Sequence, residues 1–301
     1  MKRIVSVSLG STARDKAATA VFLGEEFSVE RIGTDGSLPL FRRKLAELDG
    51  YVDAFGLGGT DMYIWAAGRR YTFRQIERLA SVAKKTPVVD GSGLKNTLER
   101  ETIHRLQDMG VLDFKRRKVL LVSAVDRFGM AEALAETGAS VVYGDFMFGL
   151  GLPLPMRSIE TVGRAARALL PLITRLPFQW LYPTGEKQNT ITPKWEKFYA
   201  EADIIAGDFP FIRRYMPPRL DGKTILTNTI RPADVDALRE RGVKTLITTT
   251  PQIDGGSFGT NVMEGVLVAL SGKPPASLTS ADYMDLLSRL HWSPQVQTLN
   301  P

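Results

Sequence analysis

A regular alternation of strand-like and helix-like segments begins at Lys118 and continues to about residue 272. Alternation of this kind is typical of a parallel sheet that is covered by helices on both faces. The sequence therefore predicts an α/β fold whose second domain, residues 115–272, is a Rossmann-like, doubly wound parallel sheet. The predicted strands are 118–124, 140–144, 178–182, 203–207, 223–228 and 244–249, and the predicted helices include 233–242 and 258–272.

The first part of the chain, residues 1–112, has a different pattern. Residues 3–10 alternate between apolar and polar side chains as in a strand, and the segments ATAVFLG and FSVERIG then follow as a hairpin. These features predict an N-terminal α/β lobe with an antiparallel portion. Residues 273–301 form a tail that contains a helix-like segment, SADYMDLLSRL, which we expect to pack back on the body of the protein.

Composition excludes several kinds of site. The chain has no cysteine, which excludes disulfides, thiolate nucleophiles and cysteine-based metal sites. Its two histidines, His104 and His291, are too few for a multi-histidine metal site, so no metal is predicted. A general base is therefore Lys, Asp, Glu or one of these histidines. Since His104 lies in a charged helix, a surface role is the simpler interpretation.

Hydropathy and charge indicate which kinds of partner the protein can have. No apolar run approaches the ~18 residues that span a bilayer, and MKRIVSVSLG resembles a first strand more than a signal peptide. These features favour a cytoplasmic protein with no membrane contact. The net charge of +6 is spread over both halves, without the basic stripe and interleaved aromatic residues of a nucleic-acid site. The excess suits an anionic small-molecule ligand. The sequence is compatible with either a monomer or a homo-oligomer.

Polar residues follow the predicted strands of the second domain. The segments after these strands are SAVDRFG, YGDF, YPTGEKQ, AGDF, TNT and TTTPQIDGGSFGTN. In open parallel sheets, ligands bind beyond the carboxyl ends of the strands. These polar ends, meeting at one edge, predict a ligand crevice, although connecting loops also need turn residues.

The segment TTTPQIDGGSFGTNVMEG is the most specific of these ends. It ends a strand, passes through a turn at 254–257 and opens a helix near Phe258 or Gly259. Free N–H groups at a helix start attract anions, and glycines let an anion approach, although Ser257 could equally be a helix cap. The residues predicted to bind an anion or substrate are Asn228, Thr250, Gly255, Gly256, Ser257, Thr260 and Asn261.

The turn after the strand at 118–124 has the position of a dinucleotide-binding loop. In the fingerprint G-x-G-x-x-G, its three glycine positions correspond to Ala124, Asp126 and Gly129. A carboxylate at 126 repels a diphosphate unless Arg127 or a metal compensates, whereas Asp145 matches the acid that binds a ribose. The turn is therefore either a cofactor site with an altered loop, formed by Ala124, Arg127, Gly129 and Asp145, or a structural βαβ unit. A second glycine cluster, FGLGGTD at 55–61, is interpreted as a turn because no helix follows it.

Lys187 and Asp208 are the predicted catalytic residues. Each lies in a glycine-containing loop just after a predicted strand, and a Lys beside an Asp can transfer an alcohol proton. The alternatives are a solvated Lys187 and an Asp208 that caps the next helix. Arg213 and Arg214 could pair with a carboxylate, but neighbouring helix residues point about 100° apart, so at least one is expected to face solvent.

Six segments are spread along nearly the whole chain: VSVSLGS, VDAFGLGG, YPTGEKQ, ADIIAGDF, ILTNT and TTTP…SFGTNVMEG. They resemble a bacterial family of quinate 5-dehydrogenases, which is similar to quinate and shikimate dehydrogenases. The resemblance implies an oxidoreductase that uses NAD or NADP on a polyhydroxylated carboxylic acid such as quinate or shikimate. Those dehydrogenases carry Asn-x-Thr-x-Pro-x-Lys upstream of the cofactor loop, whereas the nearest match here, NTITPK at 189–194, has another spacing and lies downstream.

Two classes of function follow from these patterns. The first is this NAD(P)-dependent dehydrogenase, which the βαβ opening and Asp145 favour. The alternative is a non-redox protein or transferase that binds a nucleotide or a sugar phosphate, which the missing glycines and the DGGSFGTN segment favour.

Overall fold

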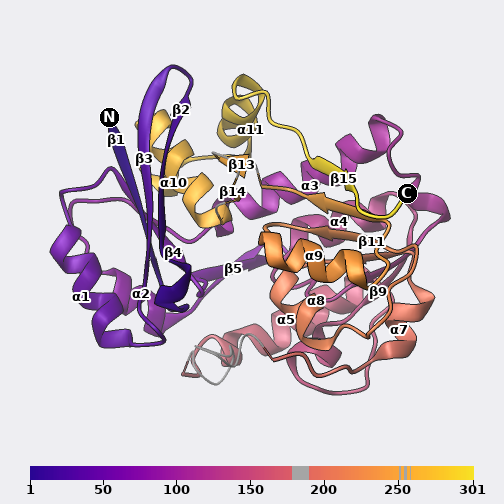
Figure 1. Ribbon diagram of the computed structural model, residues 1–301. Helices are drawn as coiled ribbons and strands as arrows, with labels where there is room; N and C mark the ends of the chain where they lie inside the picture. Colours follow the sequence, from indigo (N-terminus) through magenta and orange to yellow (C-terminus); the bar gives the residue numbers. More distant parts are fainter. Residues whose placement is uncertain (178–189, 251, 254–255, 258) are drawn as a thin grey trace.

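The computed structural model describes residues 1–177, 190–250, 252–253, 256–257 and 259–301. It has an α/β fold with two lobes that lie side by side, as Figure 1 shows. Lys187 and the predicted strand at 178–182 lie outside the described residues.

The first lobe is built on a five-stranded sheet with the order β2-β3-β1-β4-β7. Strand β1 pairs in parallel with β3 and β4, β7 continues in parallel from β4, and β2 is antiparallel to β3. The chain order reverses between β1 and β4, which makes this point a topological switch. The strands are β1 (Lys2–Ser8), β2 (Lys16–Phe22), β3 (Glu25–Gly33), β4 (Ala54–Gly58) and β7 (Val88–Val89).

The first sheet is covered on both faces. Its alternation places Val5 and Val7 in one cluster, where residues of α1 (Leu38–Leu48) and α2 (Arg74–Ala80) pack. Ile4 points into another cluster, which contains Val262 and Val266 of α10 (Thr260–Ser271). The sequence assigned this helix to the second domain, but it packs on β1, β4 and β7 of the first lobe. The chain thus crosses between the lobes more often than the predicted boundaries imply.

The second lobe contains a six-stranded sheet with the order β15-β12-β11-β10-β8-β9. All of its pairs are parallel except β12 with β15, and the chain order reverses between β8 and β10. This is the doubly wound topology that the alternation predicted. The strands are β8 (Lys118–Leu121), β9 (Ser140–Tyr143), β10 (Ile204–Ala206), β11 (Thr224–Thr227), β12 (Thr245–Thr248) and β15 (Gln295–Thr298).

Helices cover both faces of the second sheet. Val119 and Leu121 of β8 belong to a cluster with residues of α4 (Phe128–Glu136) and α5 (Ile159–Ile173). Leu120 belongs to the opposite cluster, to which α7, α8 and α9 contribute. The helices on this second face are α7 (Glu196–Glu201), α8 (Phe209–Tyr215) and α9 (Pro232–Glu240).

Helix α3 (Ser92–Asp108) leads from the first lobe into the second and packs against α4, α10 and α11 (Ser280–Arg289). The tail therefore packs back through α11 and then adds β15 to the second sheet. No helix of the described residues is long and apolar enough to cross a membrane. The remaining short elements are the hairpins β5 (Tyr63–Ala66) with β6 (Arg69–Thr72) and β13 (Gln252–Ile253) with β14 (Gly256–Ser257), the 3-10 helices η1 (Thr12–Arg14), η2 (Phe114–Arg116) and η5 (Pro275–Ser277), and a π-helical turn, η3 (Asp145–Gly149).

Candidate functional site

Lys95 joins the carboxyl ends of the two sheets. Its ammonium lies 3.2 Å from Oδ1 of Asp61, which follows β4, and 2.8 Å from Oδ1 of Asp126, which follows β8. The side chain of Lys95 is only 8% exposed, and the two carboxylates are 14% and 18% exposed. Because each carboxylate comes from a different lobe, this contact is an ionic bridge between the lobes beside both switch points.

The start of α3 is held in place by its own polar contacts. Gly91 adopts a left-handed conformation with φ of 95°, which a residue without a side chain adopts at little cost. Asp90 accepts hydrogen bonds from the backbone N–H of Ser92 at 3.0 Å and from its hydroxyl at 2.9 Å. These contacts fix the first turn of α3, on which Lys95 lies.

A second set of ion pairs continues from this bridge. Arg127 pairs with Glu99 of α3, and its Nη2 donates to Oδ1 of Asp208 at 2.7 Å. Arg127 and Glu99 are each 1% exposed. Asn228, after β11, donates from Nδ2 to Asp208 at 3.4 Å. We refer to the connected charged residues Asp61, Lys95, Glu99, Asp126, Arg127 and Asp208 as the interlobe network.

Carboxylates outnumber cations in the interlobe network. Burial, with the charges of Asp126 and Asp90, raises the pKa of Asp61 to about 7 although Lys95 opposes it. Burial likewise raises the pKa of Glu99 to about 7 against the opposing charge of Arg127. Asp61 and Glu99 are therefore poised to exchange protons near neutral pH, and pKa values shifted in this way are concentrated at functional sites.

Lys95 and Asp126 form the charged centre of the network. Burial alone would lower the pKa of Lys95, but the charges of Asp126 and Asp61 outweigh it and raise the pKa. For Asp126 burial acts in the opposite direction, and the charges of Lys95 and Arg127 keep its pKa low. Lys95 can thus donate a hydrogen bond or stabilise a negative charge, whereas Asp61 is the better proton acceptor.

Buried hydroxyl groups lie just after strands β4, β8 and β12 and at the start of α10. Within the part of the chain that the structure describes, four of these hydroxyls have no hydrogen-bond partner, although their residues are at most 8% exposed. Buried polar groups are nearly always bonded, so an unpartnered one needs an explanation such as a ligand or a water molecule. They belong to Thr60 after β4, Ser123 after β8, Thr249 after β12 and Thr260 at the start of α10.

The turn predicted to hold a cofactor is occupied by contacts within the protein. Ala124 is buried, and Arg127 is committed to Glu99 and Asp208. A side chain at Gly129 would overlap the backbone oxygen of Asn96, so this glycine permits α4 to approach α3. These contacts favour the structural interpretation of the turn over a site for a diphosphate.

Asp145 also points inward. One of its oxygens accepts a hydrogen bond from the N–H of Val125 at 2.8 Å, and burial raises its pKa to about 6. A buried carboxyl that supports the turn is not placed as the ribose-binding acid of the fingerprint is. The residues at this turn therefore do not fit a dinucleotide in the pose that the fingerprint implies.

The two predicted catalytic residues have different outcomes. Lys187 lies outside the described residues, so its role stays a prediction. Asp208 occupies the N-cap position of α8, but its side chain makes no capping bond and pairs with Arg127 instead. Asp208 therefore belongs to the interlobe network through its ion pair with Arg127, which the sequence analysis had predicted to bind a cofactor.

Part of the predicted anion-binding segment forms a short strand, where the sequence analysis expected a turn. Gly255 lies outside the described residues, while Gly256 and Ser257 form β14 and pair with β13. Helix α10 begins at Thr260 with Gly259 as its N-cap, close to the predicted start.

The N-terminus of α10 packs closely on the first lobe. Nδ2 of Asn261 donates to Oγ of Ser6 at 2.8 Å, and a Cβ at Gly91 would lie 2.9 Å from the backbone N of Asn261. This packing directs the first turn of the helix at the first sheet. Thr250 is buried, with its N–H donating to the backbone oxygen of Asn228 at 3.2 Å. An anion at this helix start stays a prediction.

The arginines of α8 diverge as neighbouring helix residues should. Nε of Arg213 lies 3.3 Å from Asp234, whereas the guanidinium of Arg214 lies over the ring of Tyr215. His104 is 42% exposed and lies 3.8 Å from Glu136, in the surface position expected for it.

Sequence reasoning missed Asp61, Lys95 and Glu99 as site residues. The rule that ligands bind at strand ends was applied to the second domain alone. Applied to the first lobe, it would have included Asp61, which follows β4, and Asp90, which follows β7.

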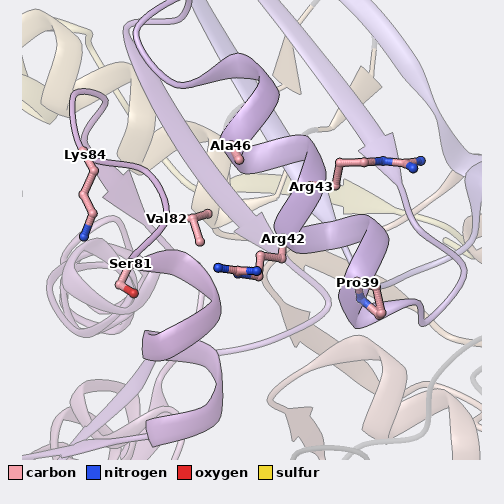
Figure 2. A pocket seen from close by; sticks show the side chains of 7 residues that line it. All are labelled: Pro39, Arg42, Arg43, Ala46, Ser81, Val82 and Lys84. Carbon is pink, nitrogen blue, oxygen red and sulfur yellow. The ribbon is translucent and has the colours of Figure 1, made fainter.

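A separate hollow lies on the surface of the first lobe. Figure 2 shows the side chains of Arg42, Arg43 and Lys84 at this hollow between α1 and the end of α2. These three residues are exposed, and the hollow has no carboxylate among its lining residues. It lies on one lobe, apart from the interlobe network.

The structural comparisons give distant similarities. The chain is similar to a glutamate dehydrogenase from Thermus thermophilus, with 15% identity over 96% of this chain and 73% of that chain and a TM-score of 0.42. It is also similar to a solute-binding protein of an ABC transporter from Burkholderia multivorans, with 12% identity over 99% of both chains and a TM-score of 0.40. A glucose-galactose binding protein from Geobacillus stearothermophilus gives 9% identity over 99% of this chain and 97% of that chain, with a TM-score of 0.39. Identities this low do not establish an activity.

The sequence comparisons divide the chain near the start of α3. No curated protein matches the chain. Residues 3–90 match the model of a domain of unknown function, DUF8753. Residues 93–299, more than half of the chain, match a second one, DUF8754, and the chain therefore belongs to the DUF8754 family.

Proposed function

We propose that this protein binds a small polyhydroxylated ligand that carries an anionic group, between the carboxyl ends of its two sheets. The observation that supports this proposal is the bridge from Lys95 to a carboxylate at the end of each sheet. In open α/β sheets, the switch point at the carboxyl ends is the usual ligand position. Here two switch points, one from each lobe, lie beside one ionic cluster.

The chemistry of the interlobe network suits hydroxyl groups. A hydroxyl both donates and accepts, and it is bound well by a carboxylate on one side and an ammonium on the other. Asp61 and Asp126 supply the acceptors, and Lys95 supplies the donor. The unpartnered hydroxyls of Thr60 and Ser123 add groups that can do either.

The same residues could promote a reaction at a bound hydroxyl. Asp61, with a pKa of about 7, would accept the hydroxyl proton. Lys95 would stabilise the oxyanion that forms, because its ammonium stays charged. In a transferase this proton transfer would activate a hydroxyl nucleophile. We favour a non-redox ligand-binding protein or transferase that acts on a sugar phosphate or a nucleotide, because the contacts of Gly129 and Asp145 do not fit a dinucleotide at the turn.

The second candidate is NAD(P)-dependent dehydrogenation of a polyhydroxylated carboxylic acid such as quinate or shikimate. The bridge of Lys95 with Asp61 favours it, since that reaction also removes a hydroxyl proton. The turn at 124–129 does not favour it, because Gly129 packs against α3 and the carboxylate of Asp145 is bound to the backbone N–H of Val125. This activity, and the family relationship that implies it, stays a proposal.

Ligand binding tests the proposal directly. Thermal unfolding and calorimetric titration of the purified chain with quinate, shikimate, ribose 5-phosphate and glucose 6-phosphate should identify a ligand that stabilises the protein. Asp61→Asn, which keeps the shape of the side chain, should weaken that binding by about 10-fold, because one charge-assisted hydrogen bond is lost. An exposed control, Asp236→Asn, should leave it unchanged. The proposal is wrong if none of these ligands binds, or if a folded Asp61→Asn variant binds the ligand as tightly as the wild-type protein.

A titration of the same protein with NADH and NADPH, followed by nucleotide fluorescence, separates the two candidates. Binding of either nucleotide would favour the dehydrogenase. Binding of a sugar phosphate without either nucleotide would favour the non-redox function.

A further inference from the structure

Strand β2 forms a long open edge of the first sheet. It has seven residues and stands first in the order β2-β3-β1-β4-β7, so β3 is its one paired neighbour among the described strands. In Figure 1 the two strands form a hairpin that rises to the top of the first lobe. Within the described residues, the side of β2 that faces away from β3 therefore presents backbone N–H and C=O groups to no other strand.

The turn of this hairpin determines which backbone groups point outward. Leu23 and Gly24 have φ of 51° and 83°, as the two central residues of a type I′ turn require. The residues beside such a turn, Phe22 and Glu25, form a hydrogen-bonded pair, and bonded and non-bonded pairs then alternate along the two strands. The residues whose backbone groups point away from β3 are therefore Ala17, Thr19 and Val21.

The sequence of β2 lacks the usual protection of an open edge. Such edges commonly carry charged residues, a proline or a bulge, each of which hinders pairing with another strand. Residues 17–21, AATAV, contain no charge and no proline, and their register with β3 has no bulge. Ala17 and Thr19 are exposed, and Val21 is 66% exposed. Their side chains are small, so another strand can approach the backbone closely.

The other edges of the two large sheets are shorter. Strand β7, at the opposite edge of the first sheet, has two residues. In the second sheet β15 and β9 have four residues each, and Tyr143 of β9 also forms a bridge with Met156. Among the described strands, β2 is therefore the edge that offers the longest stretch of backbone to a partner.

We propose that β2 pairs with β2 of a second copy of this chain, antiparallel and about a two-fold axis at Thr19, so that the two first sheets form one continuous sheet. The outward groups of the two strands then supply about six hydrogen bonds. Pairing about a two-fold axis uses the same surface on both copies and closes as a dimer. This pairing is independent of the proposed function.

A second copy fits this edge in charge as well as in hydrogen bonding. In the antiparallel register, Thr19 lies opposite its counterpart, Ala17 lies opposite Val21, and Lys16 lies opposite Phe22. No cation faces a cation, and a pair of threonines is favourable across antiparallel strands. Because one strand pair buries less than the roughly 800 Å² per partner of a standard interface, the dimer should be weak and depend on protein concentration.

Sedimentation velocity over a range of protein concentrations tests the pairing. The wild-type chain should form a dimer whose fraction increases with concentration. Thr19→Pro removes an N–H that points away from β3, so the pairing of β2 with β3 is kept. The Kd of the dimer should rise by about 10-fold or more, because a bond at the axis is lost in both copies. Gln297→Lys places a charge on β15, an exposed edge of the second sheet, and should leave the Kd unchanged.

Thr19→Lys and Thr19→Glu test the position of the axis. Each places like charges opposite each other in its own dimer and should raise the Kd by about 5-fold. An equal mixture of the two proteins should associate more tightly than either protein alone, because opposite charges then meet at the axis. Thr19 is exposed, so both variants should fold even if Thr19→Pro does not, which circular dichroism checks.

Three results would overturn the pairing. The first is a wild-type chain that stays monomeric at every concentration. The second is a dimer whose Kd is the same in the folded Thr19 variants as in the wild type, since another surface would then hold it. The third is a mixture of the Thr19→Lys and Thr19→Glu proteins that associates no more tightly than each protein alone.

Discussion

The ammonium of Lys95 pairs with two partly buried carboxyl groups that belong to different lobes. Replacing Lys95 with Met should leave Asp61 and Asp126 facing each other without the ammonium between them, with Arg127, 4.0 Å from Asp126, as the remaining nearby cation. Breaking a buried ion pair in this way costs about 3–5 kcal/mol, because the remaining charge is uncompensated. Urea unfolding of Lys95→Met should show a loss of this size in the free energy of unfolding.

An exposed ion pair provides the control for this change. Lys44 pairs with Glu47 at 3.0 Å, and their side chains are 34% and 48% exposed. Lys44→Met should change the free energy of unfolding by less than about 1 kcal/mol, as surface ion pairs do. Equal effects of the two substitutions would mean that the interlobe network does not act as a buried cluster.

Glu264 of α10 gives a prediction about pH. Its Oε2 accepts from the N–H of Gly91 at 2.6 Å, its Oε1 accepts from the hydroxyl of Tyr283 at 2.8 Å, and burial, with the charge of Asp90, raises its pKa from 4.5 to about 8. Between these two values the folded state keeps a proton that the unfolded state has released. The contribution of Glu264 to stability is therefore full below pH 4.5 and is lost as the pH rises to about 8.

Glu264→Gln should make this decline shallower, because an amide does not titrate. Free energies of unfolding from urea titrations at about pH 5 and about pH 8 measure the slope for both proteins. Some decline should persist, since burial also raises the pKa of Asp61 and Asp145. An identical slope in the variant would show that Glu264 is ionised in the folded state across this range.

Asp126 shows what sequence could say at the scale of single residues. Its carboxylate at a predicted phosphate loop required a compensating charge, and Arg127 or a metal was the expected source. In the structure Lys95, 31 positions earlier in the chain, lies at 2.8 Å, and Arg127 lies at 4.0 Å. That Asp126 needs a nearby positive charge follows from its own charge. Which residue supplies that charge depends on where α3 packs, and the local sequence pattern does not predict this packing.

At the scale of elements, Gly129 controls how closely α4 approaches α3. A Cβ on Gly129 would overlap the backbone oxygen of Asn96, which cannot rotate away as a flexible side chain could. Gly129→Ala should therefore destabilise the protein by about 1–3 kcal/mol, the usual cost of overpacking, even though Ala favours a helix by about 1 kcal/mol. Thermal or urea unfolding measures the difference.

Gly149 is a suitable control for this substitution. It is exposed, and a Cβ there would meet no atom within 4 Å. Gly149→Ala should change the free energy of unfolding by about 0.5 kcal/mol or less. A stable Gly129→Ala protein would mean that the two helices can move apart at little cost.

Helix α10 was predicted from the sequence, but the sheet on which it packs was not. Its apolar pattern predicted a helix at 258–272, and the structure has one at Thr260–Ser271. The pattern identifies a face that must be buried, but it does not say which sheet buries it. The prediction assigned it to the adjacent Rossmann-like domain, whereas Val262 and Val266 pack with Ile4 and Ala54 of the first lobe.

At the scale of the whole molecule, the two lobes share parts of their cores. One cluster of buried residues runs from Phe41 and Ile76 of the first lobe to Phe128 and Val162 of the second. Helix α10 returns to the first sheet, and β15 then pairs with β12 of the second. Because the chain crosses repeatedly, we expect that the segments that match the two domain models do not fold independently.

This arrangement predicts that the intact chain unfolds in one transition. A fragment of residues 1–91 would expose the sheet face that Val262 and Val266 cover, and each buried valine contributes about 1.5–3 kcal/mol. That loss is large beside the total stability of about 5–15 kcal/mol that domains of this kind have. The fragment should therefore show no cooperative unfolding. Joining residues 259–272 to the fragment through a flexible linker should restore part of the lost stability.

Urea titrations of the whole chain, followed by circular dichroism and by tryptophan fluorescence, should give coincident midpoints. Trp65 lies in the first lobe and Trp195 in the second. Two separate midpoints, or a cooperative transition in the fragment alone, would show that the first lobe folds without α10.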